Sequence, residues 1–169
     1  MAAYAKKISS ETVDLAVTFR QVASLIQNTM GGTSGAIYAI FFNAVSTYLD
    51  KATSSGACYS TFLAEALQSG LTELCKYTSA RVGSRTLMDA LIPAVEALHK
   101  NAQDLQGAVA AARSGAESTR GMDAKLGRAS YVAKEQLGSE AEGGVPDPGA
   151  LGVVSILEGV AAGLSHRLN

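Results

Sequence analysis

The spacing of apolar residues is helical along most of this chain, and it limits the fold to a bundle of α-helices. The clearest stripe repeats every three or four residues and consists of Leu15, Phe19, Val22, Ile26 and Met30. Residues at that spacing share one face of a helix, whereas a half-buried strand alternates at every second residue. We therefore predict an all-α fold: an antiparallel helical bundle or barrel of about six helices with short connections.

Glycine, proline and short polar side chains divide the pattern into six predicted helices. Their approximate ranges are 10–28, 35–51, 57–77, 85–101, 102–125 and 148 to the end. The predicted N-caps are Ser9 or Ser10 for the first helix, Ser84 for the fourth, and Asp147, followed by Pro148, for the last.

Four features of these helices predict how they pack. The segment 36–45 is apolar on nearly every side, which is typical of a buried helix; a strand is disfavoured because the run is long and does not alternate. Small residues dominate 108–119, so that helix should lie close to its neighbours. Pro93 should kink the fourth helix. The predicted inner face of the last helix is Leu151, Val154, Leu157, Ala161, Leu164 and Leu168.

Composition excludes several classes of function. The 169 residues are enough for one domain, 1–169, and the 14 basic and 15 acidic residues argue against a nucleic-acid partner. The apolar run 36–45 is too short to span a membrane, which needs about 20 residues, so we expect no membrane partner and a cytoplasmic location. Cys58 and Cys75 fall in apolar segments as core thiols, and two histidines near helix ends make no zinc set.

The loop before the second predicted helix is a candidate phosphate site. Gly31, Gly32 and Gly35 surround Thr33 and Ser34 where one helix stops and a buried one begins. Glycine lets a ligand approach the backbone, and the first N–H groups of a helix carry partial positive charge. An ordinary helix–turn–helix corner explains the same residues, so both interpretations remain open.

Three other loops are weaker candidates on their own. Arg128 lies between glycine and small residues, where it could bind a phosphate or simply face solvent. Asp147 and Pro148 are explained by helix capping, but Gly149 is costly in a first helical turn. The stretch 83–89 is another entry into a helix, for which capping is again sufficient.

Together and in this order, the segments MGGTSGAIYAIFF, GSRTLMDALIPA, GRASYV and DPGA closely resemble the nucleotide-binding L-type domain of dihydroxyacetone kinases. The resemblance covers about 8–164. It implies a barrel of antiparallel helices, eight in the family, that binds ATP or ADP at one end. It implies phosphoryl transfer from ATP to dihydroxyacetone or a related triose, or an L-type subunit that holds ADP in a phosphotransferase-linked kinase. Substrate is bound in that family by a separate domain, on the same chain or another, through a histidine, and neither His99 nor His166 lies in such a motif.

The resemblance also implies roles for individual residues. Thr33 and Ser34, with Gly32, match the family's phosphate-contacting loop. Leu87 stands where a methionine often packs against adenine, and Thr78 where a small residue lines the pocket. Arg128 and the helix entry at Asp147, Pro148 and Gly149 match further residues beside the nucleotide.

One departure from the family concerns magnesium. Family members carry an aspartate-rich loop of the form GDGDxG, which binds Mg²⁺ and precedes the first glycine motif. In this chain, Asp14 is the single aspartate among the thirty residues before Gly31. A serine, Ser84, also replaces the acid of the family's GDRT pattern. We therefore expect metal ligands to be absent, the domain to be incomplete at its N-terminus, and apolar helix faces to be exposed, which predicts a homodimer or poor solubility. Phosphoryl transfer needs cations, so this chain alone should be inactive.

Two other functions are compatible with these residues. A non-catalytic module could bind nucleotide without magnesium or turnover, or present an interaction surface. A bundle without any ligand would lose nothing but stability when Arg128 is replaced.

Overall fold

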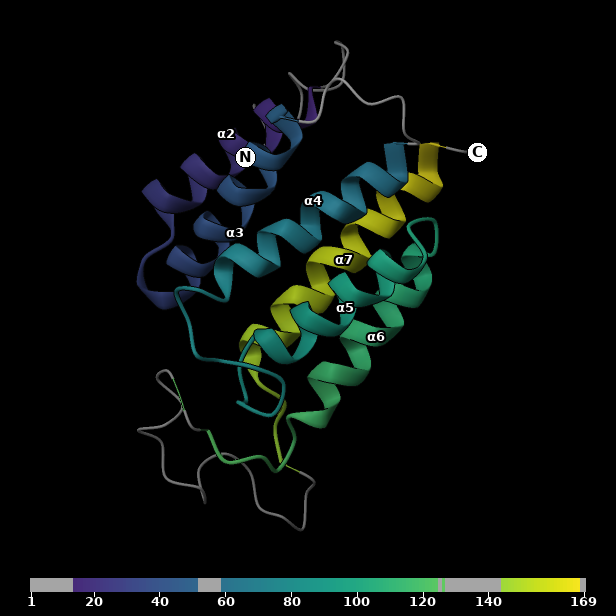
Figure 1. The fold of residues 1–169 in the computed structure, drawn as a ribbon. Coiled ribbons are helices and arrows are strands. Elements are labelled where there is room, and N and C mark those ends of the chain that lie inside the picture. The colour runs from purple at the N-terminus through teal and green to yellow at the C-terminus, as the bar shows by residue number, and fades with distance from the viewer. Residues whose placement is uncertain (1–13, 52–58, 125, 127–143, 168–169) are drawn as a thin grey trace.

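The computed structural model describes residues 14–51, 59–124, 126 and 144–167, and every regular element in those ranges is an α-helix. The helices are α2 (Leu15–Thr29), α3 (Gly32–Lys51), α4 (Tyr59–Leu74), α5 (Met88–Lys100), α6 (Leu105–Ser118) and α7 (Pro148–Arg167). The predicted all-α fold is confirmed, and the strand alternative for 36–45 is wrong, because that segment lies within α3 (Figure 1).

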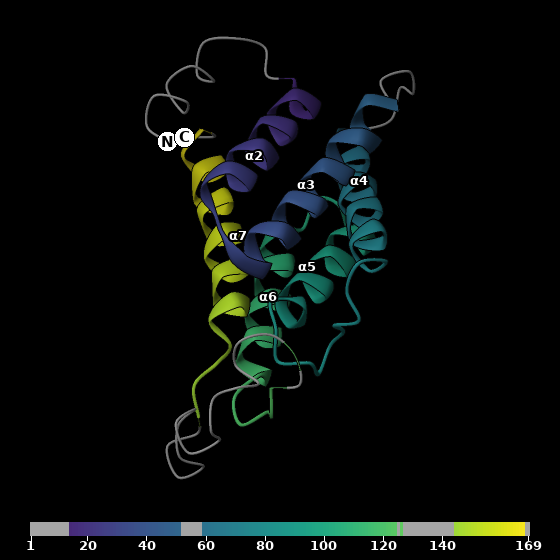
Figure 2. The same cartoon turned by 90° about the vertical axis from the view of Figure 1, so that its left-hand side faces the viewer.

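Helices that follow one another in the chain pack side by side, from α2 against α3 through to α6 against α7, and α5 also contacts α7. Within the described residues, α7 makes no comparable backbone contact with α2, α3 or α4. The helices from α2 to α7 surround a common centre, as the views in Figures 1 and 2 show. The bundle is therefore a barrel that is open on the side between α7 and α2.

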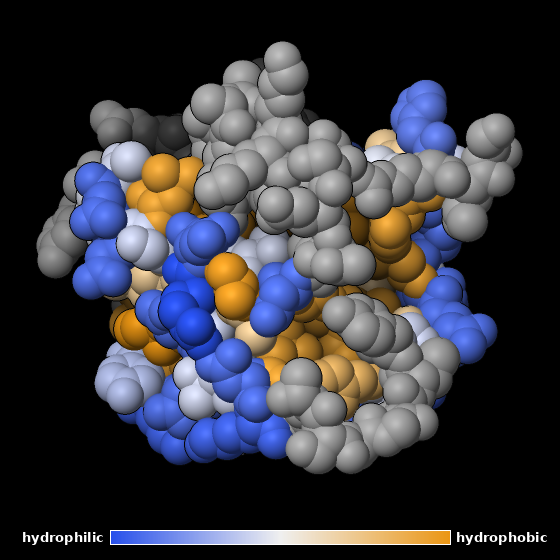
Figure 3. Space-filling model, turned by 90° about the horizontal axis from the view of Figure 1, so that it is seen from above, coloured by the Kyte–Doolittle hydropathy of each residue, from blue (hydrophilic) through white to orange (hydrophobic). Residues whose placement is uncertain are grey.

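The centre of the barrel holds an apolar cavity of about 500 Å³. All six helices line it, for example through Phe19, Tyr38, Leu67, Leu91, Leu105 and Leu157. Figure 3 shows apolar surface between the helices in this region, with polar residues on the outside of the bundle.

Close approach of α5 and α6 confirms the prediction drawn from the small residues. Ala108, Ala112 and Ala116 are fully buried, and a Cβ built on Gly115 would lie 2.0 Å from the carbonyl oxygen of Asp89 in α5. Only glycine allows the two backbones to approach this closely. Pro93 lies inside α5, as expected, and the kink that it should cause stays a prediction.

The buried face of α7 differs from the predicted one. Leu151 and Leu164 are 39% and 53% exposed, so their assignment to the core is wrong, and Leu168 lies outside the described residues. The helix is buried through Ala150, Val153, Val154 and Ala161. Because the main backbone contacts of α7 are with α6 and α5, one side of it stays open, and Ile156 and Val160 are about half exposed there.

By length and composition, α7 is the one helix in the described ranges that could cross a membrane, with a mean hydropathy of 1.4 over residues 148–166. Core helices of water-soluble proteins pass the same test. Here α7 packs against α5 and α6, and 22% of this stretch is buried inside the bundle.

Several predicted helix ends are corrected by the observed caps. The helix predicted over 10–28 begins at Leu15, because the Asp14 carboxylate accepts a hydrogen bond from the Val17 amide and caps it; Ser9 and Ser10 lie outside the described residues. The third helix ends at Leu74 instead of continuing to 77. The fifth spans only 105–118 because Asp104 caps it at the start and Thr119 ends it.

The predicted start of the fourth helix is also wrong. Arg85 has a φ of +56°, in the left-handed region, so the helix cannot include it and begins at Met88. Ser84 does not cap this helix, because its hydroxyl accepts a hydrogen bond from the Arg81 amide. Leu87 occupies the N-cap position without a side-chain cap. The predicted stripe of this helix, Leu87, Leu91, Val95 and Leu98, is buried as expected.

Candidate functional site

Three of the four polar loops singled out in the sequence, 31–35, 83–89 and 147–150, lie at one end of the barrel, where α3 and α7 begin and α4 and α6 end (Figures 1 and 2). The fourth, around Arg128, lies outside the described residues. The segment 75–87, which joins α4 to α5, also lies at this end. A contact between elements supports this placement, because a Cβ on Gly152 in α7 would lie 3.7 Å from the Tyr38 hydroxyl of α3.

The first turn of α3 is open to solvent. The helix begins at Gly32, three residues earlier than predicted, and Gly32 has a φ of +78°, which reverses the chain directly after α2. Thr33 and Ser34 are exposed beside the first amides of the helix. The glycine at position 35 is required by packing within the chain and not by the approach of a ligand. A Cβ built there would lie 2.0 Å from the Met30 carbonyl oxygen.

The first turn of α7 is capped by the buried carboxylate of Asp147. Asp147 is 8% exposed, and its Oδ2 accepts a hydrogen bond of 2.9 Å from the Ala150 amide, which confirms the predicted N-cap. Pro148 follows as the first helical residue. Gly149 packs against Leu87: a Cβ there would lie 3.2 Å from the Leu87 Cβ and 2.9 Å from the carboxylate of Asp147. The costly glycine is thus explained by a contact within the chain.

The connecting segment 75–87 places the two remaining described candidates. Thr78 is half-buried and its hydroxyl accepts a hydrogen bond of 3.1 Å from the Ala80 amide. The Arg81 guanidinium donates to the carbonyls of Cys75, Thr78 and Ala80 and so fixes the turn. Leu87 is 5% exposed, in contact with the start of α7.

Asp89 organises the entry to α5. Its carboxylate is fully buried and accepts hydrogen bonds from the amides of Gly83, at 2.5 Å, and Thr86, at 2.8 Å. Both oxygens are therefore engaged with the backbone. The same holds for one oxygen of Asp147, so these two acids act as structural acceptors.

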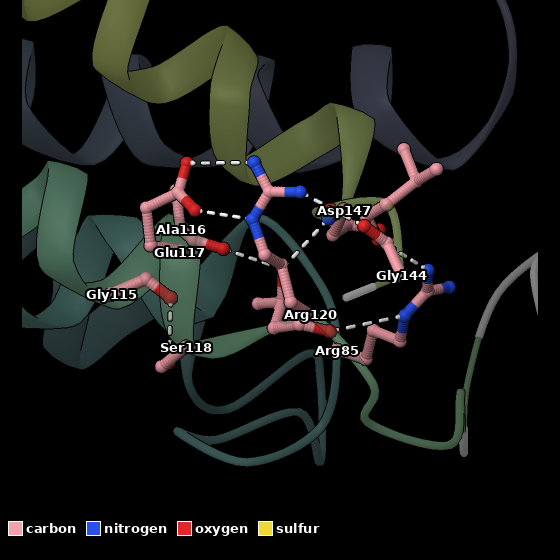
Figure 4. A network of polar contacts seen from close by, with 10 residues as sticks. Arg85, Gly115, Ala116, Glu117, Ser118, Arg120, Gly144 and Asp147 are labelled. Carbon is pink, nitrogen blue, oxygen red and sulfur yellow. Dashed lines mark hydrogen bonds and ion pairs between the residues drawn. The ribbon is translucent and has the colours of Figure 1, made fainter. Parts of the chain in front are cut away.

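The structure adds Arg85, Thr119 and Arg120, which sequence reasoning missed. The Arg85 guanidinium donates to the carbonyl oxygens of Thr119 and Val145, and Arg120 donates to the carbonyl of Gly144 (Figure 4). The Thr119 hydroxyl accepts from the Asp147 amide at 2.7 Å. Three side chains thus hold the segment that leads into α7. No local pattern announces them, since their partners are backbone carbonyls and an amide 24 to 60 residues away in the chain.

Tyr38 connects the cavity to the polar end. It lines the cavity and is 9% exposed. Burial, and secondarily the negative charge of Asp147, raise the pKa of the Tyr38 hydroxyl above its usual 10.0. The hydroxyl therefore stays protonated at neutral pH.

The acids that the structure describes are spread out or already hydrogen-bonded to the backbone. No group of three or more metal-binding side chains lies together among these residues. Asp89 uses both carboxylate oxygens on backbone amides, and Asp147 caps α7. Asp89 therefore has no oxygen free for a magnesium ion, and the cap takes one of the two carboxylate oxygens of Asp147.

Eight of the nine predicted nucleotide-binding residues fall in the described ranges, all at this end of the barrel: Gly32, Thr33, Ser34, Thr78, Leu87, Asp147, Pro148 and Gly149. Direct contact joins Leu87 to Gly149 and Asp147 to Gly149. Arg128 lies outside the described residues.

Comparison with known proteins identifies relatives along nearly the whole chain. The profile of the DAK2 domain family matches residues 1–162. The dihydroxyacetone kinase of Komagataella pastoris is 46% identical over 144 residues, covering 83% of this chain and 24% of the relative. That of Pichia angusta is 43% identical over 159 residues, covering 92% and 26%. The chain thus spans about a quarter of the length of these relatives.

A solved structure shares the fold. The crystal structure of the dihydroxyacetone kinase from C. freundii in complex with AMP-PNP and Mg²⁺ superposes with a TM-score of 0.64 at 33% identity, over 88% of this chain and 23% of that chain.

Proposed function

Since the chain belongs to the DAK2 domain family, we propose that it is a nucleotide-binding domain that holds ATP or ADP at the end of the barrel where α3 and α7 begin. The observation that carries this proposal is the open first turn of α3. Exposed Thr33 and Ser34 hydroxyls stand beside helix amides that have no intrahelical partner, and Gly32 turns the backbone away. Such a turn favours a phosphate group.

The adenine side of the proposed site is apolar. Leu87 and Gly149 are in contact at the boundary between the connecting segment and α7, and Thr78 lies on the same segment as Leu87. A base could pack on this surface while its phosphates extend toward α3. Arg128, by resemblance, would supply a bidentate donor to the phosphates.

We propose further that the chain is the nucleotide-binding part of a dihydroxyacetone kinase-like system, in which a separate domain holds the triose. Transfer from ATP requires cations on the phosphates, and the described acids do not assemble a site for them. We therefore expect nucleotide binding without turnover when this chain is assayed alone.

A second candidate, a non-catalytic nucleotide-binding module, is favoured by one specific observation. Both carboxylate oxygens of Asp89, and one of those of Asp147, accept hydrogen bonds from backbone amides, which leaves few carboxylate oxygens here for a cation. Binding of the same strength with and without magnesium, and no transfer when a triose-binding domain is added, would support this module over the kinase part. Magnesium-dependent binding would favour the kinase part.

The first experiment is calorimetric titration with ATP and ADP, each with and without magnesium. Gly32→Val should abolish binding because it forces a branched side chain into a left-handed backbone at the phosphate turn. Gly31→Val is the matched control, since a Cβ on Gly31 meets nothing within 4 Å. If the Gly32 variant is folded and binds as the parent does, the phosphate site is misplaced.

A further inference from the structure

The positively charged Arg85 side chain is buried without an acidic partner among the described residues. It is 3% exposed and makes no ion pair with any residue that the structure describes. Its Nη1 is the one fully buried side-chain nitrogen or oxygen in the described ranges without a hydrogen-bond partner. Burying a guanidinium without an acid is costly, so the contacts that it does make must offset that cost.

Those contacts join three segments that are far apart in the chain. Nε donates to the Thr119 carbonyl at 3.4 Å, directly after α6, and Nη2 donates to the Val145 carbonyl at 2.9 Å, just before α7. The backbone of Arg85 itself belongs to the turn that Asp89 holds through Thr86. A lysine has one nitrogen and could not reach both carbonyls with the same planar geometry.

A continuous path leads from Arg85 to the first turn of α7. Thr119, whose carbonyl Arg85 holds, receives the Asp147 amide on its hydroxyl at 2.7 Å. Asp147 in turn caps Ala150. Gly149, between them, packs on Leu87, which lies two residues after Arg85. The path therefore returns to the segment from which it started, and Figure 4 shows its central part.

We propose that Arg85 is a positioning residue for nucleotide binding: by gripping the Thr119 and Val145 carbonyls, it sets the start of α7 against Leu87. The left-handed backbone at Arg85 supports this role, because a residue with a side chain adopts that conformation only where its surroundings enforce it. The part of the inference that concerns nucleotide rests on the proposed function. The part that concerns the order of α7 does not.

Arg85→Gly tests the idea because glycine adopts the left-handed backbone without strain, so the variant deletes the side chain and keeps the turn. The matched control is Arg20→Ala, which removes an exposed guanidinium that pairs with Asp50 between α2 and α3 and takes no part in holding the start of α7. Arg85→Lys is the second variant, which keeps the charge should the glycine variant fail to fold.

Two measurements are made on each variant. Amide hydrogen exchange at Asp147 and Ala150 should accelerate about tenfold or more in Arg85→Gly, with little change at Val45 in α3. ADP affinity by calorimetry should fall about tenfold or more, the loss expected for hydrogen bonds from a charged group. Millimolar guanidinium ion should restore affinity in Arg85→Gly and leave the affinity of Arg20→Ala, which should match that of the parent, unchanged. Arg85→Lys should show the same local acceleration to a smaller degree.

The outcomes separate the two proposals. If the parent chain binds no ADP, the proposed function fails, and the exchange data still decide the role of Arg85. Unchanged exchange at Asp147 and Ala150 in a folded variant would overturn the inference. So would equal acceleration at Val45, which would mean that Arg85 supports the fold as a whole and has no special link to α7.

Discussion

Replacement of Gly115 by alanine provides the sharpest test of the packing that positions the site. Gly115 lies in α6 against the backbone of α5, and a Cβ there would be 2.0 Å from the Asp89 carbonyl oxygen, whereas real Cβ contacts are essentially never under 3.0 Å. The two helices must therefore separate by about 1 Å or more. Gly159, in the middle of α7, is the control, because its Cβ would meet nothing within 4 Å.

The magnitude follows from two opposing terms. Glycine to alanine in a helix interior gains about 1 kcal/mol at both positions. Overpacking costs about 1–3 kcal/mol, and a clash with backbone belongs at or above the upper end. Gly159→Ala should therefore raise the free energy of unfolding by about 1 kcal/mol, and Gly115→Ala should lower it by about 2 kcal/mol. The melting temperature should rise by about 2–4 °C in the first variant and fall by about 4–8 °C in the second.

Urea and thermal unfolding, followed by far-UV circular dichroism, measure both variants. Because Asp89 holds the amides of Gly83 and Thr86, displacement of α5 should also weaken nucleotide binding in Gly115→Ala. If Gly115→Ala is as stable as Gly159→Ala, the close approach of α5 and α6 is not a feature of the folded protein, and the argument fails.

Three further predictions concern the polar end of the barrel. Asp147→Ala and Asp104→Ala each remove an N-cap and should each cost about 1 kcal/mol of stability; only Asp147→Ala should weaken ADP binding, and equal affinities in calorimetry would contradict the placement of the site. The raised pKa of Tyr38 means that the unfolded chain loses its phenol proton first, so the free energy of unfolding should fall as the pH rises above about 10, by up to about 1.4 kcal/mol per pH unit. Tyr38→Phe should remove this slope in urea titrations between about pH 9 and pH 11, and parallel curves for parent and variant would refute the assignment. Arg128→Ala, chosen on the family resemblance, should weaken ADP binding by about 1.5–3 kcal/mol, and unchanged affinity would exclude Arg128 from the site.

The helices could be predicted from the sequence because each buries a stripe with a helical period. The stripe from Leu87 to Leu98 is buried as expected, and Asp147 with Pro148 marks the start of α7 through local capping chemistry. Burial on α7 could not be predicted in the same way. Its apolar residues lie on several faces, so which of them is buried depends mainly on the contacts with α5 and α6, and Leu164 stays exposed.

The sequence indicated which loops form the candidate site, but not the hydrogen bonds and helix ends that position them. The motifs indicated loops at helix starts, and the loops gather at one end. Ser84 was expected to cap a helix because serine often does so, yet the left-handed Arg85 moves the helix start to Met88. The partners of Arg85 lie 34 and 60 residues away, and a contact at that separation leaves no trace in local sequence patterns.

Departures from local rules concentrate at this one end of the barrel. Arg85 combines a left-handed backbone with a buried, unpaired guanidinium, Leu87 begins a helix without a capping side chain, and Gly149 occupies a first helical turn. Each departure costs stability and persists only because neighbouring contacts enforce it. Natural proteins accept such costs mainly at functional sites. The clustering therefore agrees with the proposed position of the nucleotide at this end of the barrel.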